Sequence, residues 1–156
     1  MLLIDGYNLL FKTRGFDPKR LEEARDGLVR RVAAHCAATG RRARIFFDPS
    51  RSGTGLRSVR KSPGIEVVQL SEMSADEAIR GLVAESSDRT QYRVISSDHE
   101  VSGAAEKRGF AFMASEDFLA ELEAAERGDP REKPEGCGPG DLDYWMKQFG
   151  LGGTQK

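Results

Sequence analysis

The stretch MLLIDGYNLLF, residues 1–11, places apolar residues directly before an acid, a glycine, an aromatic residue and an amide. Leu2 to Asp5 is too short and too apolar for a half-exposed strand, so we expect it to be a central parallel strand. The DGYN that follows raises a question. An Asp before Gly6 is typical of a turn, yet an acid and an amide three positions apart also suit a metal site. The rest of the chain decides between the two.

Composition narrows the class of protein. A chain of 156 residues fits one domain with its own core. The hydrophobic fraction of 38% and the charged fraction of 31% are those of a globular protein, and no apolar run approaches the ~18 residues of a membrane helix. The start lacks the basic and small-residue segments of a secretory signal. We therefore expect a cytoplasmic protein with no membrane partner.

Cysteine and histidine are too sparse to build a metal site. Cys36 and Cys137 lie far apart without a CxxC pair, and His35 and His99 stand alone. A metal in this protein would therefore be held by oxygen atoms, which favours Mg²⁺ or Mn²⁺.

Strand and helix patterns alternate along the chain. Apolar or β-branched runs predict strands at residues 2–5, 43–47, 65–70, 92–95 and 110–113, and helical patterns begin near Asp17, Ser74, Asp98 and Ser115. This alternation predicts an α/β fold with a doubly wound, mainly parallel five-stranded sheet flanked by helices.

The composition changes after the last predicted helix. We expect residues 1–127 to form the domain, residues 128–140 to be a Gly- and Pro-rich linker, and residues 141–156 to form a short C-terminal helix and tail. The apolar side of that helix includes Trp145. Docking on the chain's own domain is favoured over docking on a partner, because an exposed Trp face is costly in solvent.

Acids follow the predicted strands at corresponding places. Asp5, Asp48 and Asp98 follow the first, second and fourth strands, and Asp76 lies in the first turn of the helix after the third. Ligands of open parallel sheets bind outside the carboxyl ends of the strands. Carboxylates gathered there raise one another's pKa unless a divalent cation neutralises them. A cation site at this edge is the economical explanation.

Each acid also has a purely structural explanation. Asp48 before Pro49 suits a β-turn, and Asp98 is a good helix N-cap, with Ser97 as the competing residue. Ser74 and Glu77 match a capping box, in which Asp76 merely favours the helix dipole. Taken singly, these explanations prevail.

The coincidence of place favours the metal site. Turn chemistry predicts no preference for Asp over Ser, Thr or Asn at every one of these strand ends, and Asn8 adds a polar group near Asp5. Ser115, Glu116 and Asp117 at the fifth strand end are secondary candidates, because acids are expected in the first turn of any helix.

The motifs resemble those of a known family. DGYN, FFD, SADEAI and SSD, in this order, are similar to the NYN domains of the PIN-like nuclease superfamily, and most of all to the YacP-like proteins. The resemblance covers roughly residues 1–125. It implies a PIN-like fold, metal-dependent endonucleolytic cleavage of RNA, association with the ribosome, and an acidic site formed by Asp5, Asp48, Asp76 and Asp98, with Asn8 in support. After Asp98, the pair His99-Glu100 replaces a basic residue of many relatives.

Basic residues gather in one part of the sequence. Residues 41–61 contain Arg41, Arg42, Arg44, Arg51, Arg57, Arg60 and Lys61 against the single acid Asp48. The segment SRSGTGLRSVRKSPG, residues 50–64, predicts an exposed loop. We expect Arg42, Arg44, Arg51, Arg57, Arg60 and Lys61 to bind RNA phosphates, a solvated mobile loop being the alternative.

The predicted function is therefore that of a Mg²⁺- or Mn²⁺-dependent endoribonuclease. The main alternative is a non-catalytic RNA- or ribosome-binding module on the same fold. A phospho-acceptor receiver domain would need a lysine after the fifth strand, which the sequence FAFMAS at 110–115 does not offer. A phosphatase acting on small molecules fits the basic, open loop less well than a nuclease does.

Overall fold

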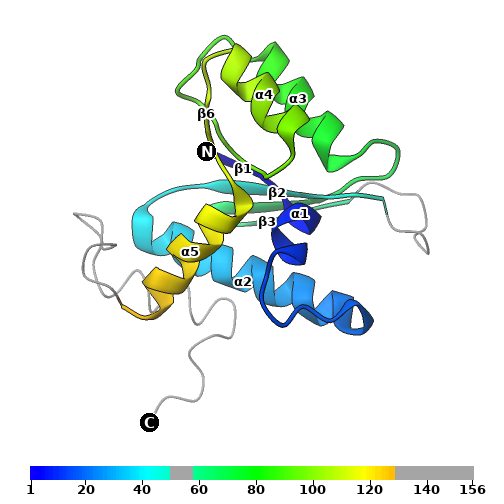
Figure 1. Cartoon of the computed structure of the whole chain (residues 1–156), viewed down its shortest axis with the longest axis vertical. Helices are drawn as coiled ribbons and strands as arrows, with labels where there is room; N and C mark the ends of the chain where they lie inside the picture. Colours follow the sequence, from blue (N-terminus) through cyan, green and yellow to red (C-terminus); the bar gives the residue numbers. More distant parts are fainter. Residues whose placement is uncertain (50–57, 129–156) are drawn as a thin grey trace.

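Six strands form one sheet in the order β3-β4-β2-β1-β5-β6, with helices on both faces (Figure 1). The computed structural model describes residues 1–49 and 58–128. The strands are β1 (Leu2–Asp5), β2 (Ala43–Phe47), β3 (Ser58–Ser62), β4 (Ile65–Gln69), β5 (Arg93–Ile95) and β6 (Ala111–Met113). The helices are α1 (Gly6–Phe11), the 3₁₀ turn η1 (Pro18–Arg20), α2 (Leu21–Thr39), α3 (Ala75–Glu85), α4 (His99–Lys107) and α5 (Ser115–Glu126).

The predicted α/β fold class is confirmed, and one strand is added to the sheet. All neighbouring strands pair in parallel except β3 and β4, which form an antiparallel hairpin. The prediction of a loop was therefore wrong for Ser58–Ser62. Its polar residues show no apolar period, because β3 is an edge strand and its backbone pairing with β4 suffices to define it. Gly64, with a φ of +79°, closes the hairpin.

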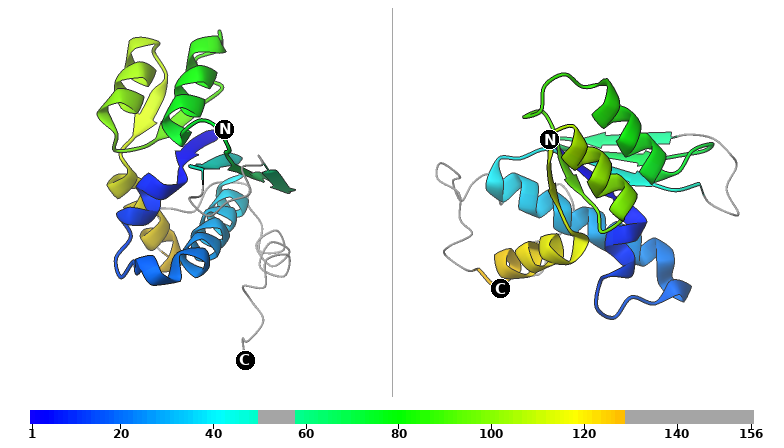
Figure 2. Two further views of the ribbon diagram at one scale, coloured as in Figure 1. Left: turned by 90° about the vertical axis from the view of Figure 1, so that its right-hand side faces the viewer. Right: turned by 45° about the horizontal axis from the view of Figure 1, so that its top comes forward.

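Helices lie on both faces of the sheet (Figure 2), and an apolar layer lies between the sheet and the helices on each face. Leu2 and Ile4 of β1 face the layer that contains α1, α2 and α5, while Leu3 faces the layer that contains α3 and α4. Leu3 and Ile4 are both fully buried, as expected for a parallel strand covered on both faces. The prediction that the first strand is central is confirmed by its pairing with β2 and β5.

The strand order places a topological switch at β1. From β1 the chain passes through α1 and α2 to the neighbouring strand β2, and later crosses through α3 from β4 to β5 on the other side of β1. Connections diverge there to opposite faces of the sheet, which opens a crevice outside the carboxyl ends of the strands. The last residue of β1, at that crevice, is Asp5.

Several helix ends agree with the sequence signals, and others differ. The capping box of Ser74 and Glu77 is present, and Gly40 ends α2 in the left-handed conformation. Asp17 caps the 3₁₀ turn, after which α2 begins at Leu21. Ser115 is the first residue of α5, whose N-cap is Ala114, so this helix begins where its pattern predicted although Ser115 is not the cap.

Short helix α1 was not foreseen. It begins at Gly6 and occupies the DGYN motif itself, which the sequence suggested as a turn or a metal site.

The C-terminal predictions concern residues outside the described part. Apart from Gly128, the proposed linker (128–140) and the proposed helix and tail (141–156) lie beyond the described residues. Within residues 1–49 and 58–128, no helix is both long and apolar enough to cross a membrane.

Candidate metal centre

Asp5 ends β1 and at the same time caps α1. Its Oδ1 accepts a hydrogen bond from the Asn8 amide at 3.2 Å, and the residue is only 8% exposed. Burial raises the pKa of Asp5 to about 6. The Asn8 hydrogen bond opposes this rise, while the charges of Asp48, Asp76 and Asp98 add to it. These acids are therefore close enough to act on one another, as the strand-end argument predicted.

Asp48 and Asp98 bind the starts of two helices. Asp98 caps α4, its Oδ1 accepting from the amides of Glu100 at 2.8 Å and Val101 at 3.4 Å. Asp48 follows β2, and its Oδ1 accepts from the Ala75 amide at the start of α3, at 2.6 Å. The predicted capping role of Asp98 is confirmed, and Asp48 joins the end of β2 to α3.

Asp76 has a different partner. Its Oδ2 lies 3.1 Å from the Arg80 guanidinium one helical turn later. Its Oδ1 is buried and has no hydrogen-bond partner among the described residues. Burial raises the pKa of Asp76; Arg80 opposes this effect, and Asp98 and Glu100 add to it. A buried carboxylate oxygen without a donor is costly unless a cation or a water satisfies it.

The carboxylates share one pattern. In each of Asp5, Asp48, Asp76 and Asp98, one oxygen is bound by a backbone amide or by Arg80. The second oxygen makes no hydrogen bond to the described residues. A capping bond fixes the orientation of a side chain, so that its free oxygen is held in one direction. A capping role and a metal-binding role are therefore compatible in one carboxylate, because the cap would orient the ligand.

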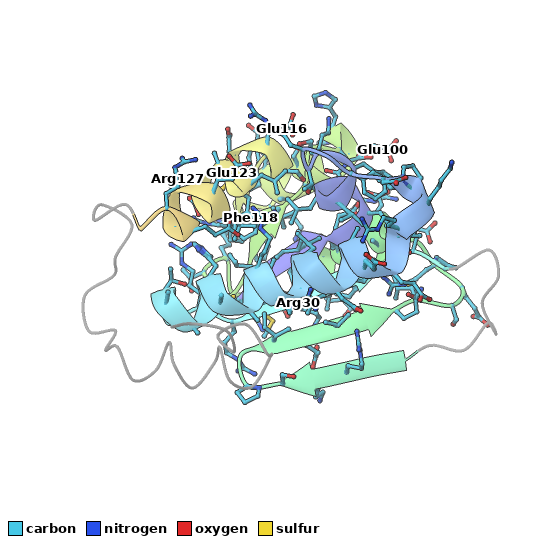
Figure 3. The ribbon with its side chains drawn as sticks, turned by 90° about the horizontal axis from the view of Figure 1, so that it is seen from below. Arg30, Glu100, Glu116, Phe118, Glu123 and Arg127 are labelled. Atoms are coloured by element: carbon cyan, nitrogen blue, oxygen red, sulfur yellow. The ribbon has the colours of Figure 1, made fainter. Side chains whose placement is uncertain are left out.

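Glu100 joins the group, and the sequence analysis did not select it. One carboxylate oxygen from each of Asp76, Asp98 and Glu100 lies within 4.8 Å of the others. Figure 3 labels Glu100 at the start of α4. Its position in the first turn after the Asp98 cap was the available signal. Acids are common in the first turn of a helix because they interact favourably with the helix dipole, so the sequence offered no reason to single out Glu100.

Asn8 connects the segments around this edge. Its Oδ1 accepts from the Ser97 amide at 2.9 Å and from the Ser115 hydroxyl at 2.7 Å. The Ser97 hydroxyl in turn accepts from the Ser115 amide at 3.0 Å and donates to Glu116. Asn8 thus ties α1 to the ends of β5 and β6, and its side-chain nitrogen is free of hydrogen bonds to the described residues.

Lys12 extends this network to α5. Its Nζ lies 3.8 Å from the Glu116 carboxylate, which Figure 3 labels at the start of α5. Glu116 is exposed, and the Ser97 hydroxyl is the first cause that lowers its pKa. Of the secondary candidates, Ser115 and Glu116 are therefore structural neighbours of the site through Ser97 and Asn8.

The predicted RNA-binding residues that the structure describes lie in different surroundings. Arg51 and Arg57 lie outside the described residues. Arg44 pairs with Glu66, and Lys61 Nζ lies 3.6 Å from the same carboxylate. Arg60 is exposed on β3.

Arg42 is separated from the others. It precedes β2 and lies at the amino end of the strand, the opposite edge from the carboxylates.

A doubly wound sheet with carboxylates near its switch point agrees with the PIN-like, nuclease-type domain that the sequence resemblance implied. The model of the YacP-like NYN domain matches residues 2–135. The chain belongs to this family, which confirms the resemblance seen in the sequence.

Individual relatives agree. The chain is 31% identical over 148 residues to YacP of Bacillus subtilis (strain 168), named as an uncharacterized protein; the match covers 87% of this chain and 86% of that protein. It is also similar to the crystal structure of the W164L mutant of Rae1 (YacP) from Bacillus subtilis, with a TM-score of 0.66 and 27% identity over 92% of this chain and 97% of that one. A second crystal structure of Rae1 (YacP) matches with a TM-score of 0.65 and 25% identity, over 97% of this chain and 84% of that one.

Proposed function

We propose that this chain is a metal-dependent endoribonuclease that hydrolyses RNA phosphodiester bonds. The observation that carries the proposal is the set of carboxylate oxygens at the switch point that make no hydrogen bond to the described residues, among them the buried Oδ1 of Asp76. Membership of a nuclease-type family supports it. The proposal includes mRNA at the ribosome as substrate and a cytoplasmic location.

The donor set fits a hard divalent cation. Carboxylate oxygens, with no sulfur and no imidazole among them, are the ligands of Mg²⁺ and Mn²⁺. Asp5, Asp48, Asp76 and Asp98 are the residues that would hold the ion, with Glu100 as an additional ligand. Burial is the first cause of the raised pKa of Asp5 and Asp76, and the neighbouring carboxylates add to it. Both effects fit this assignment, because each disfavours an ionised carboxylate that no cation neutralises.

The chain's own residues orient the reaction. A bound divalent ion supplies Lewis-acid activation of water and stabilises charge on the phosphate during in-line displacement. The capping bonds at Asp5, Asp48 and Asp98 hold their free oxygens in place without further reorganisation. The ion pair with Arg80, one helical turn later in α3, orients the Asp76 carboxylate. Asn8 fixes the relative positions of α1, β5 and α5, and its side-chain nitrogen, which bonds to no described residue, can donate to water or phosphate.

The test is an endonuclease assay with the full chain. A mixture of single-stranded and structured RNA is incubated with Mg²⁺, with Mn²⁺ or with EDTA, in the presence and absence of ribosomes. The comparison is between the wild type, Asp98→Asn and the control Asp26→Asn, an exposed residue of α2. Asn is as good an N-cap as Asp, so Asp98→Asn should leave α4 intact.

We expect RNA cleavage to require the metal and to be unchanged in Asp26→Asn. In Asp98→Asn the cleavage rate should fall about a hundredfold or more, which is the size of effect seen when a group that stabilises transition-state charge is removed. Full cleavage by Asp98→Asn would reject the site. RNA binding without cleavage under any condition would establish the non-catalytic binding module instead.

A further inference from the structure

A hollow of about 660 Å³ lies at the amino ends of the strands. Its lining includes Arg41, Arg42, Arg89, Arg93 and Tyr92. Met1 also lines it, so the N-terminal mark in Figure 1 shows its position. The strands β1, β2 and β5 have their carboxyl ends at the acidic site, so this hollow is at the opposite edge of the sheet.

Strand register brings the arginines together. Leu2 pairs with Ala43 on one side and with Arg93 on the other, so the residues just before β2 lie across β1 from the first residue of β5. Backbone hydrogen bonds hold this arrangement, from the Leu2 amide to the Arg42 carbonyl at 2.8 Å and from the Arg93 amide to the Met1 carbonyl at 3.0 Å. These arginines are therefore presented by the rigid sheet edge.

Arg89 reaches the hollow from the segment between α3 and β5. Its side chain passes close to Gly109, where an added Cβ would lie 3.0 Å from the Arg89 Cδ. Gly109 has a φ of +78° and ends the turn after α4. The missing side chain at Gly109 leaves room for Arg89 to lie across this edge.

The charge of the hollow is not neutralised within residues 1–49 and 58–128. No acidic side chain of these residues lines it, and none of its arginines forms an ion pair with a carboxylate there, unlike Arg44 and Arg80. The positive field is visible at the Met1 amino group, whose pKa is lowered first by burial and then by Arg42. Like charges held together at a rigid edge favour an anionic ligand.

The chemistry of the lining selects phosphate. Guanidinium groups bind phosphate through two parallel hydrogen bonds, and arginine is the preferred residue for nucleic-acid backbones. Tyr92 adds a half-buried aromatic wall, supported by Phe110 with ring centroids 6.3 Å apart. Arginines beside an aromatic ring are typical of surfaces that hold RNA.

The distance between the arginine hollow and the acidic site favours a long ligand. The strands between the two edges rise ~3.3 Å per residue, so the four residues of β1 separate the hollow from the acidic site by about 13 Å. A polynucleotide can follow the surface from one edge to the other. We propose that the arginine hollow binds the phosphate backbone of RNA, so that the protein holds its substrate at a point remote from the cleavage site. The nature of the polyanion rests on the proposed function.

The test measures RNA binding separately from cleavage. Arg41→Gln/Arg89→Gln removes two exposed charges of the hollow, and Arg30→Gln/Arg127→Gln removes two exposed charges near α2 and α5 as the matched control (Figure 3). Fluorescence anisotropy with a labelled single-stranded RNA, in EDTA and at several KCl concentrations, gives affinity and salt slope. We expect the hollow variant to bind about tenfold or more weakly, with a salt slope reduced by about one to two, while the control keeps both.

Competition identifies the ligand. Unlabelled RNA should displace the probe from the wild type at far lower phosphate concentration than AMP or inorganic phosphate, and polyglutamate should compete poorly. Equal competition by AMP would assign the hollow to a small phosphorylated ligand, and equal competition by polyglutamate would assign it to acidic proteins; either result overturns the proposal. An unchanged salt slope in a folded Arg41→Gln/Arg89→Gln, checked again in Arg42→Gln, overturns it as well.

Failure of this proposal and failure of the proposed function are distinguishable. Cleavage that Asp98→Asn abolishes, together with unaltered RNA binding in the hollow variant, rejects the hollow alone. Weakened RNA binding in the hollow variant of a protein that cuts no RNA supports the hollow and rejects the nuclease.

Discussion

Asp5→Asn should make the metal-free protein more stable while it removes a proposed ligand. The pKa of Asp5 rises from 3.8 to about 6 on folding, chiefly because the carboxyl group is buried. Asn keeps the shape of the side chain and can still accept the Asn8 hydrogen bond that starts α1. The substitution therefore removes the buried charge and leaves the cap.

The magnitude follows from the pKa shift. A rise of about two units, at 1.36 kcal/mol each, means that keeping Asp5 ionised in the metal-free fold costs about 3 kcal/mol. Between pH 3.8 and 6 the folded state binds more protons than the unfolded state. Wild-type stability therefore falls as the pH rises through this window. The variant has no proton to lose, so its advantage grows from near zero at about pH 4 to about 3 kcal/mol above pH 7.

Urea denaturation in EDTA, followed by circular dichroism between pH 4.5 and 8, measures the difference. His35 also affects stability in this pH range. Burial lowers the pKa of His35, so both proteins lose stability as the pH falls below the pKa that this residue has in the unfolded chain. This loss is the same in the wild type and in Asp5→Asn, so it cancels in the difference between them. Added Mg²⁺ should stabilise the wild type and leave Asp5→Asn unchanged, because only the intact site gains from binding. Equal stability of the two proteins at pH 7.5 in EDTA would refute the reasoning.

Two further substitutions test the packing around the site. Gly6→Ala should destabilise the fold by about 1–3 kcal/mol through overpacking and weaken Mg²⁺ binding by displacing Asp5, because the new Cβ would lie 2.5 Å from Phe47 and 2.9 Å from the Phe46 carbonyl. The control Gly81→Ala in α3, with no atom within 4 Å of its Cβ, should instead stabilise the fold by about 0.5–1 kcal/mol. Unchanged thermal melts and metal titrations for Gly6→Ala would contradict the overpacking argument. His35→Leu should stabilise the fold by about 1 kcal/mol at pH 7, because both ring nitrogens are buried without a hydrogen-bond partner among the described residues. It should also abolish the loss of stability that His35 causes as the pH falls below 6.5; an unaltered pH profile in urea titrations would show that His35 gains its proton as readily in the folded chain as in the unfolded one.

Local patterns in the sequence predicted the elements well. The apolar run of Leu2 to Asp5, the capping box at Ser74 and the cap at Asp98 all involve residues within four positions of one another, so their energetics are visible in the linear order. The strand-end rule predicted that Asp5, Asp48 and Asp98 lie at the carboxyl edge of the sheet, since it requires only that the strands be parallel. The hairpin strand β3 was missed because its polar residues carry no period, and its backbone pairing with β4 is a long-range property.

The sequence by itself therefore determined the α/β class, the central strand and the acidic ends, because burial periodicity and capping act over a few residues. Only the tertiary structure decided that each acid binds the protein through one oxygen while the other makes no hydrogen bond to the described residues, and that Glu100 joins Asp76 and Asp98. It also decided that Arg41 and Arg42 meet Arg89 and Arg93 at the opposite edge. These arrangements depend on strand order and register, which join residues far apart in the chain.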